Sequence, residues 1–343
     1  MASAGRATVR AVAADTGVSI ATVSRVLNGR AHVAPETRRR VQEAVDRLNR
    51  QAVRARSARV ISSGAVLVRC PYELTDYFGP IVSSVAETLR LHRREVLLDA
   101  GGAGYHDDVL RRLPTRRDVA GAVLVLPPET TAELLTLRAS GVPFVVADPR
   151  VRVPRDILAV SAANFAGARD ASEHLIQLGH RRIGVISVDP PLAAGDERLG
   201  GHASALAAVG ALVDSGLIRY GEPIEPTGLR AGGELLDLAD RPTAIVCFND
   251  KVAVGVLHAA AERGISVPDE LSVVGFDDID VSRATTPQLT TVRQPLQEMG
   301  RMAVMTLMRV IEGHDAEALH IELAAELVVR GTTAPPRGGG VAG

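Results

Sequence analysis

Residues 8–28 read TVRAVAADTGVSIATVSRVLN, and this stretch predicts two short helices joined by a tight turn. Thr8 is placed to cap the first helix and Ser19 the second, because hydroxyl oxygens accept hydrogen bonds from the first free amides of a helix. Gly17 tolerates the left-handed backbone that a sharp helix exit needs. The apolar residues recur at helical spacing: Val9, Val12 and Ala13 in the first helix, and Val23, Val26 and Leu27 in the second. The pattern predicts a helix-turn-helix whose second helix enters a DNA major groove.

Charge is divided unevenly along the chain. Residues 1–60 contain 12 Arg against 4 Asp and Glu, a net charge of +8, whereas the whole chain carries −1 and residues 61–343 carry −9. A basic head on an acidic body is typical of a module that binds phosphates. A helical hairpin with a solvated basic face would give the same count, so charge alone leaves both readings open.

Composition divides the chain into four parts. Residues 1–50 form the helical head, with a third helix expected after the first two, and residues 51–62 form a basic connector. Residues 63–330 alternate short apolar runs with amphipathic stretches, which predicts parallel sheets covered by helices on both faces. Residues 331–343 are rich in Pro and Gly, and we expect a disordered tail there. The expected strands are 65–68, 96–99, 121–126, 144–147, 183–187, 244–248 and 272–276, and two of the expected helices are 164–178 and 249–264.

Bulk properties exclude several classes of protein. The chain has 343 residues, 46% of them hydrophobic, which is enough for a small head and one or two larger α/β units. No apolar segment of membrane-spanning length and no signal-peptide core are present, so we expect no membrane association and a cytoplasmic location. Cys70 and Cys247 lie far apart, as in a reducing compartment. No nucleophile elbow, phosphate-binding loop or metal-spaced His/Cys cluster is present, so we expect no catalytic residues, no metal and no cofactor.

Residues 17–29, GVSIATVSRVLNG, closely resemble the headpiece signature of the lactose-repressor/galactose-repressor (LacI/GalR) family. Four segments of the body are similar to the matching family segments: 164–187, 197–206 (ERLGGHASAL), 244–278, which includes AIVCFND and VVGFDD, and 285–300. The resemblance implies an N-terminal all-α helix-turn-helix headpiece followed by an α/β two-lobed domain like that of periplasmic binding proteins, with parallel sheets. It also implies three crossings of the chain between the lobes, near 160–164, 289–294 and 320–328.

The resemblance assigns the DNA-reading residues to the second helix. Ile20 and Ala21 can make only apolar contacts with base edges, whereas Arg25 can bind a guanine through two hydrogen bonds. Short polar side chains are suited to phosphates, which fix the register without reading sequence: Thr8, Ser19, Thr22, Ser24 and Asn28. For Thr8 and Ser19, helix capping is the main role expected. Family members bind near-palindromic operators as dimers, and we expect a homodimer on double-stranded DNA here.

The connector departs from the family pattern. Family members carry a Leu that wedges into the minor groove and bends the DNA, but Ala58 stands at that position. Arg54 and Arg56 can still enter a narrow minor groove. We therefore expect less DNA bending and a steeper salt dependence of binding.

The resemblance also predicts a cleft between the lobes that binds a small-molecule effector. Its expected lining residues are Tyr77, Phe78, Asn164, Arg198, Asn249 and Asp277. Arg198 and Asp277 would offer fixed donors and acceptors to the hydroxyls of a sugar-like ligand. Simpler roles remain open, since Asn249 is placed to cap a helix and Phe78 to belong to the core. Two family features are missing: the acid of a Val-Asp-Asn segment, replaced by Ala163, and an aromatic residue near 223–227.

Taken together, these features predict a sequence-specific, DNA-binding transcriptional regulator, a repressor, located in the cytoplasm and associated with the nucleoid. A small, sugar-like effector bound between the lobes would control its affinity for operator DNA. The altered connector leaves a second interpretation open: a soluble small-molecule sensor with weak or non-specific DNA binding. An enzyme on the same scaffold is the third, and it lacks a motif to support it.

Overall fold

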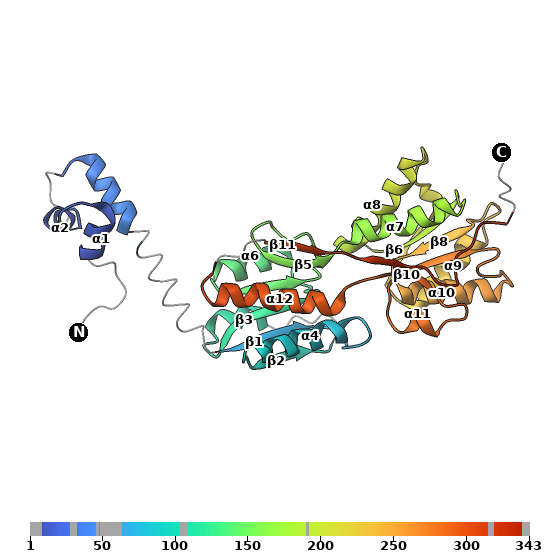
Figure 1. Cartoon of the computed structure of the whole chain (residues 1–343), viewed down its shortest axis with the longest axis horizontal. Helices are drawn as coiled ribbons and strands as arrows, with labels where there is room; N and C mark the ends of the chain where they lie inside the picture. Colours follow the sequence, from blue (N-terminus) through green and yellow to red (C-terminus); the bar gives the residue numbers. More distant parts are fainter. Residues whose placement is uncertain are drawn as a thin grey trace.

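The computed structural model describes residues 9–27, 33–45, 48, 64–102, 109–189, 192–314 and 319–337. They form a small helical head and two α/β lobes (Figure 1). No helix in these ranges is long and apolar enough to cross a membrane.

The head contains helices α1 (Val9–Thr16) and α2 (Ile20–Leu27), followed by a helical stretch over residues 35–45. Gly17 has a φ of 67°, the left-handed turn expected between the first two helices. The Ser19 hydroxyl accepts a hydrogen bond from the Thr22 amide at 3.3 Å, so the predicted cap of α2 is confirmed. A small core joins the three helical segments: Val12, Val23, Val26, Val41 and Ala44.

The first lobe is built on a six-stranded parallel sheet in the order β11-β5-β4-β3-β1-β2. Helices α4 and α12 contribute to the core on one face, and α5 and α6 to the core on the other. Strands β3 and β4 are buried along their whole length, which explains their purely apolar sequences. The elements are β1 (Ala65–Cys70), α4 (Phe78–Leu91), β2 (Val96–Ala100), α5 (Val109–Arg112), η1 (Leu113–Thr115), β3 (Val119–Val125), α6 (Thr131–Ala139), β4 (Phe144–Ala147), β5 (Leu158–Ala162), α12 (Leu296–Ile311) and β11 (His320–Leu323).

The second lobe repeats this plan with the strand order β12-β10-β9-β8-β6-β7, in which only β12 is antiparallel to its neighbour. Helices α7 and α8 pack on one face and α9 and α10 on the other. The elements are α7 (Asn164–Gln177), β6 (Ile183–Val188), α8 (Ala193–Ala208), η2 (Ser215–Leu217), β7 (Ile218–Gly221), α9 (Glu225–Leu236), β8 (Ala244–Cys247), α10 (Asp250–Glu262), β9 (Ser272–Asp277), α11 (Val281–Ala284), β10 (Thr290–Arg293) and β12 (Glu326–Val328).

The chain crosses between the lobes three times, as predicted. It passes from β5 to α7, returns from β10 to α12, and crosses again from β11 to β12 (Figure 1). The third crossing is short, so a single extended segment supplies an edge strand to each sheet. These crossings lie at the carboxyl ends of β5, β10 and β11, the edge at which α/β sheets bind ligands.

All seven predicted strands are present, with ends that differ by at most two residues. Five further strands were not predicted: β5, β7, β10, β11 and β12. Three of these, β7, β11 and β12, are sheet edges, and their partly exposed, polar sequences lack the continuous apolar runs by which the others were found. Strands β5 and β10 are short and contain Ser or Thr, which weakened the same signal.

The prediction of disorder from residue 331 onward is wrong for residues 331–337. Thr332 is fully buried, and its hydroxyl donates to the Val273 carbonyl at 2.7 Å and accepts from the Thr290 amide at 2.9 Å. The Ala334 amide donates to the Ser272 hydroxyl at 3.0 Å. Side-chain hydroxyls thus satisfy a backbone that its Pro and Gly content excludes from regular structure.

Candidate functional site

Helix α2 presents a free outer face. Val23 and Val26 point into the core of the head, whereas Ile20 is 53% exposed and Ala21 and Arg25 are exposed. Ser19, Thr22 and Ser24 lie beside this face, and the hydroxyls of the first two are 2.9 Å apart. The predicted base readers therefore lie together on a capped helix, free to meet a groove.

One residue of α2 differs from its expected position, and part of the predicted DNA-binding set cannot be placed. Leu27, expected on the apolar inner face, is 41% exposed at the end of α2. Four predicted residues lie outside the described ranges: Thr8, Asn28, Arg54 and Arg56.

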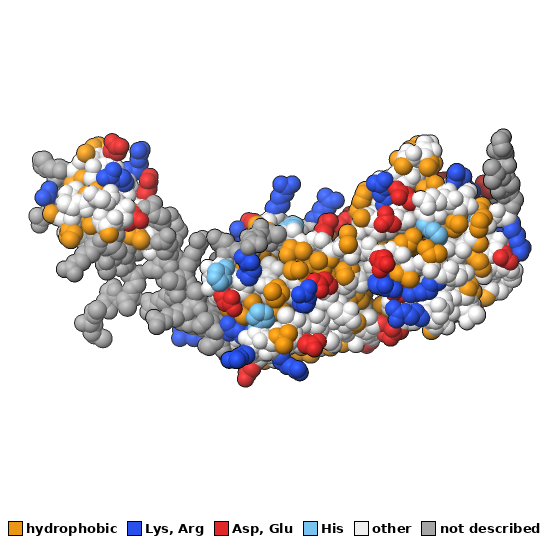
Figure 2. Space-filling model, viewed as in Figure 1, with side chains coloured by type: hydrophobic (Ala, Val, Ile, Leu, Met, Phe, Trp, Pro, Cys, Tyr) orange, Lys and Arg blue, Asp and Glu red, His pale blue; other side chains and the backbone are white. Residues whose placement is uncertain are grey.

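Figure 2 shows the charged side chains on one side of the two lobes. Acidic and basic side chains are interspersed over the visible side of the lobes. This agrees with the net charge of −9 on residues 61–343 and leaves the head as the basic part of the chain.

A cleft lies between the lobes, with about 690 Å³ of space including the part open to solvent. Five of the six predicted effector residues line it: Tyr77 and Phe78 from the first lobe, and Arg198, Asn249 and Asp277 from the second. The sixth, Asn164, faces a neighbouring groove between the lobes. Its side chain holds Arg198 from behind, through a hydrogen bond of 3.0 Å from Arg198 Nε.

Arg198 is the most firmly held side chain of the cleft. Its Nη1 donates to the Phe248 carbonyl at 2.5 Å, and its guanidinium lies 4.4 and 3.6 Å from the ring centroids of Phe248 and Phe276. Its Nη2 lies 3.8 Å from Asp277 Oδ1. A guanidinium fixed in this way can meet a ligand without losing much side-chain entropy.

Asp277 lies at the end of β9 with a φ of 111°, a backbone conformation that residues other than glycine rarely adopt. Gln294 Nε2 donates to its carboxylate at 2.7 Å. Burial raises the pKa of Asp277 to about 7, against the opposing effects of Arg198 and Gln294. Near neutral pH this carboxyl group can therefore accept a hydrogen bond or, when protonated, donate one.

The wall formed by the first lobe carries a second acid that sequence reasoning missed. Asp148 follows β4 directly, with a φ of 55°, and accepts a hydrogen bond of 2.8 Å from the Tyr77 hydroxyl. Burial raises the pKa of both groups. Phe78 stacks on Tyr72, with ring centroids 4.7 Å apart, and meets Tyr77 edge-on. The signal that could have found Asp148 was a polar residue immediately after a buried parallel strand.

Asn249 has the structural role that the sequence left open. Its Oδ1 accepts from the Val252 amide at 2.9 Å and so caps α10, while its Nδ2 donates to the Pro223 carbonyl at 3.1 Å. Lys251, in the first turn of the same helix, also lines the cleft and was not predicted to do so. Phe248 supplies an aromatic ring, although none was found near 223–227.

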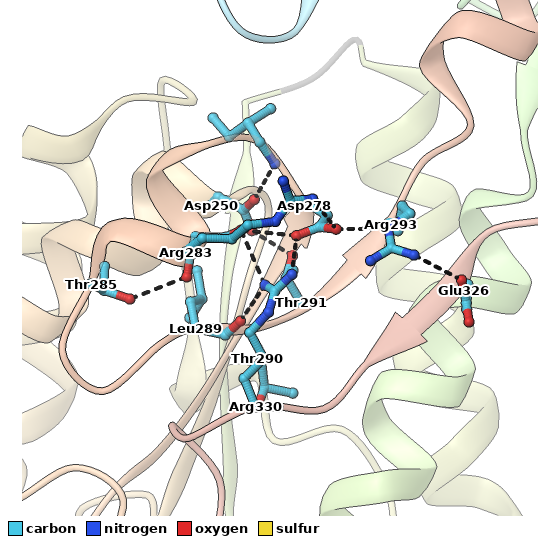
Figure 3. Close-up of polar contacts among 12 residues, drawn as sticks. Asp250, Asp278, Arg283, Thr285, Leu289, Thr290, Thr291, Arg293, Glu326 and Arg330 are labelled. Carbon is cyan, nitrogen blue, oxygen red and sulfur yellow. Dashed lines mark hydrogen bonds and ion pairs between the residues drawn. The ribbon is translucent and has the colours of Figure 1, made fainter.

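A cluster of ion pairs around the side chain of Asp278, the residue after Asp277, fixes the loop that follows β9 (Figure 3). The Asp278 side chain is completely buried and accepts hydrogen bonds from Arg330 Nη2 at 2.5 Å, Arg293 Nε at 2.7 Å and Arg283 Nη2 at 3.2 Å. Burial opposes its ionisation, but these donors outweigh that effect and lower its pKa to about 2. Arg293 also pairs with Glu326 at 3.2 Å, so the cluster joins β10 to β12 beside two of the crossings.

A second buried acid holds the same loop from the other side. Asp250 accepts from the Thr291 hydroxyl at 2.5 Å and from the Ile279 amide at 2.9 Å. Burial raises its pKa well above the usual value. The donors around these two acids are the protein's own side chains and the Ile279 amide. No group of His, Cys, Asp and Glu among the described residues could hold a metal ion.

Comparisons with known proteins agree with this architecture. Residues 8–51 match the bacterial regulatory proteins of the lacI family, and residues 172–333 match the periplasmic binding protein-like domain. The chain is 32% identical over 332 residues to the transcriptional regulator CelR of Thermobifida fusca, covering 95% of this chain and 98% of CelR. It is 35% identical over 341 residues to the regulator MalR of Streptomyces coelicolor, covering 95% and 96% of the two chains.

Solved structures give the same result. A complex of the transcriptional regulator CelR with cellobiose matches with a TM-score of 0.70 and 30% identity, covering 95% of this chain and 100% of that chain. The lac repressor dimer bound to operator and an anti-inducer matches with a TM-score of 0.69 and 25% identity, covering 96% and 99%. Because such relatives are transcriptional regulators, the prediction that the chain is not an enzyme is confirmed. The chain belongs to the LacI family of bacterial transcriptional regulators.

Proposed function

We propose that this protein is a homodimeric repressor of near-palindromic operators, released or retained by a small effector bound between its lobes. The observation that carries the effector control is the convergence of fixed polar groups from both lobes on one cleft, beside the three crossings. A ligand that touches Tyr77 and Arg198 at once bridges the lobes and favours their closure. The CelR complex with cellobiose and the operator complex of the lac repressor support the two halves of the proposal.

In the proposed division of roles, the head reads DNA and the body sets its affinity. Arg25 binds a guanine edge, Ile20 and Ala21 contact thymine methyl groups, and Ser19, Thr22 and Ser24 meet phosphates. Thr8, Asn28, Arg54 and Arg56 are proposed DNA contacts on the sequence alone. The four-part organisation belongs to the same proposal: head 1–50, connector 51–62, body 63–330 and tail 331–343. Residues 331–337 of the tail are ordered against the second lobe. Such a protein works in the cytoplasm, on the nucleoid.

In the cleft, we assign ligand contact to Arg198, Asp277, Tyr77 and Phe78. Asn164 acts through Arg198, whose Nε it holds, and Asn249 acts by capping α10 beside the cleft. The coupling between ligand and operator in such systems typically amounts to about 1–3 kcal/mol. Sugar-like ligands suit this set, because hydroxyl groups can both donate to the acids and accept from Arg198.

An in vitro selection of random duplex DNA with the full-length protein tests the proposal. Recovery of a palindrome with half-sites about one helical turn apart is the expected result, because a two-fold dimer presents two copies of α2. Recovery of no motif, with binding that vanishes as salt rises, would contradict it. The small-molecule sensor with non-specific DNA binding, motivated by Ala58 in the connector, would then be the better description.

A further inference from the structure

Lys251 is the only lysine of the chain, and it lines the interlobe cleft. It lies in the first turn of α10 and is half-buried. An ammonium group that is partly shielded from water is stabilised by an opposite charge at close range. The partners available to Lys251 in the cleft therefore indicate what kind of ligand it can bind.

The other charged groups of the cleft are already engaged. Arg198 is held by Asn164, the Phe248 carbonyl and two aromatic rings. Asp148 accepts from Tyr77, and Asp277 accepts from Gln294. Within the described ranges the Lys251 ammonium forms no hydrogen bond or ion pair, and its one recorded interaction is a longer-range attraction to Asp277. The N–H donors of the Lys251 ammonium are therefore available to a ligand in the cleft.

The two acids do not neutralise the two cations at neutral pH. Burial raises the pKa of Asp277 to about 7, so a large fraction of this group is protonated there, and burial raises the pKa of Asp148 as well. An empty cleft in this state carries excess positive charge on Arg198 and Lys251. Closing the lobes around a neutral ligand would remove water from Lys251 without giving it a partner, whereas an anionic ligand would supply one.

We propose that the effector is a small polyol that carries one anionic group, a carboxylate or a phosphate, and that Lys251 binds that group. Arg198 and the acids Asp148 and Asp277 then hold its hydroxyls. This inference rests on the proposed function of the cleft and adds the chemical class of the ligand. Lys251 is the residue that determines the preference for charge.

Calorimetric titration of the full-length protein with matched sugars tests the assignment. The probes are glucose, glucuronate and glucose 6-phosphate, together with ribose and ribose 5-phosphate. At least one anionic member is expected to bind about tenfold or more tightly than its neutral counterpart, the effect of one charge-assisted contact. A preference for glucuronate alone indicates a carboxylate site, and a preference for the sugar phosphates a phosphate site.

Two variants separate charge from shape. Lys251→Met keeps the aliphatic length and is expected to abolish the preference for the anionic member, whereas Lys251→Arg keeps the charge and is expected to retain most of it. Thermal unfolding without ligand verifies that both variants fold. The proposal is overturned if a neutral sugar binds as tightly as its acidic partner, if Lys251→Met leaves the preference unchanged, or if no probe binds the folded protein.

The outcome can be separated from that of the proposed function. A recovered palindrome from which neutral glucose or ribose releases the protein would support the repressor and reject the anionic effector. Failure of the DNA selection would reject the repressor, whichever sugar binds. The two experiments therefore report on different claims.

Discussion

Arg25 is the residue proposed to read a base from α2. It is exposed on the outer face of the helix, while Val23 and Val26 fix the inner face. Arg25→Ala should lose about 1–3 kcal/mol of discrimination at one base pair of each half-site. Arg25→Lys is the matched control, because it retains the charge without the planar fork and should lose discrimination while keeping more of the non-specific affinity. Binding to the selected operator and to its single-base variants measures both, and equal preferences in Arg25→Ala and wild type would refute the base-reading role.

Asp278 should matter far more to folding than another acid of equal charge. Asp278→Asn leaves Arg330 and Arg293 without their buried partner, a change that typically costs about 3–5 kcal/mol of unfolding free energy. Asp269→Asn is the control, because Asp269 is 61% exposed in its pair with Arg337 and such pairs contribute about 0–1 kcal/mol. Urea unfolding of both variants compares them. A similar small effect for the two would mean that the cluster contributes nothing beyond a surface ion pair.

The contributions of the neighbouring acids Asp277 and Asp278 to the unfolding free energy should depend on pH in opposite directions. The folded pKa of Asp278 is lowered to about 2, so its stabilising effect is present above its ordinary value near 4 and is lost as the pH falls towards 2. The folded pKa of Asp277 is raised to about 7, so its contribution to stability falls as the pH rises from about 4 through 7. The unfolding free energy of the wild type minus that of Asp277→Asn should therefore decline as the pH rises from 5 to 8. A flat difference would show that Asp277 titrates at its ordinary value.

At the scale of elements, the packing of α7 against α8 depends on a glycine. A methyl group at Gly201 would overlap the Phe165 carbonyl oxygen and lie 2.9 Å from the Arg169 amide, both backbone atoms that cannot yield cheaply. Its neighbour Gly200 would meet only the Phe165 ring at 3.5 Å, an ordinary contact. Gly201→Ala should destabilise the protein by about 1–3 kcal/mol or more, whereas Gly200→Ala should be neutral or stabilising through helix propensity. Thermal unfolding of the pair decides, and equal effects would mean that the helices can separate at no cost.

The elements also show what sequence patterns can and cannot reveal. Strands such as β3 and helices such as α2 were predictable because burial on fixed faces imposes a period on the residues. Edge strands such as β7 and β12 face solvent on part of their surface, so no period marks them. Residues 331–337 were misjudged because their order comes from hydroxyl hydrogen bonds to β9 and β10, which no local pattern encodes.

The cleft was predictable only in part for a similar reason. Arg198 and Asp277 could be assigned from family motifs, and Tyr77 and Phe78 likewise. Asp148 and Lys251 were missed, because they come from different parts of the chain and only the folded chain brings them to one cleft. Gln294, which donates to Asp277, was missed for the same reason. Asn164 was assigned to the ligand, but its place behind Arg198 gives it an indirect role. Sequence motifs identify individual residues, whereas the topology of the fold decides which residues line the same cleft.

On the scale of the whole molecule, the two lobes are joined by three crossings. Within the second lobe, the cluster around Asp278 fastens β10 to β12 and to the segment that carries Arg330, beside two of these crossings. Residues of the cleft and residues of this cluster are neighbours along the chain: Asp277 lines the cleft and Asp278 is the centre of the cluster, while Gln294, which donates to Asp277, follows Arg293. We therefore expect a ligand that displaces Asp277 to act directly on the segments beside these crossings.

The strand order also determines the order in which the parts of the protein can fold during synthesis. The first lobe cannot be completed until the ribosome has made α12 and β11, because these elements cover its sheet and supply its edge strand. The head emerges first and depends on neither. A nascent or truncated chain can therefore present a folded DNA-reading helix long before it has a cleft to govern it. A chain that ends before residue 296 would keep the whole sequence of the head but would lack α12 and β11, so the first lobe, and with it one wall of the cleft, would be incomplete.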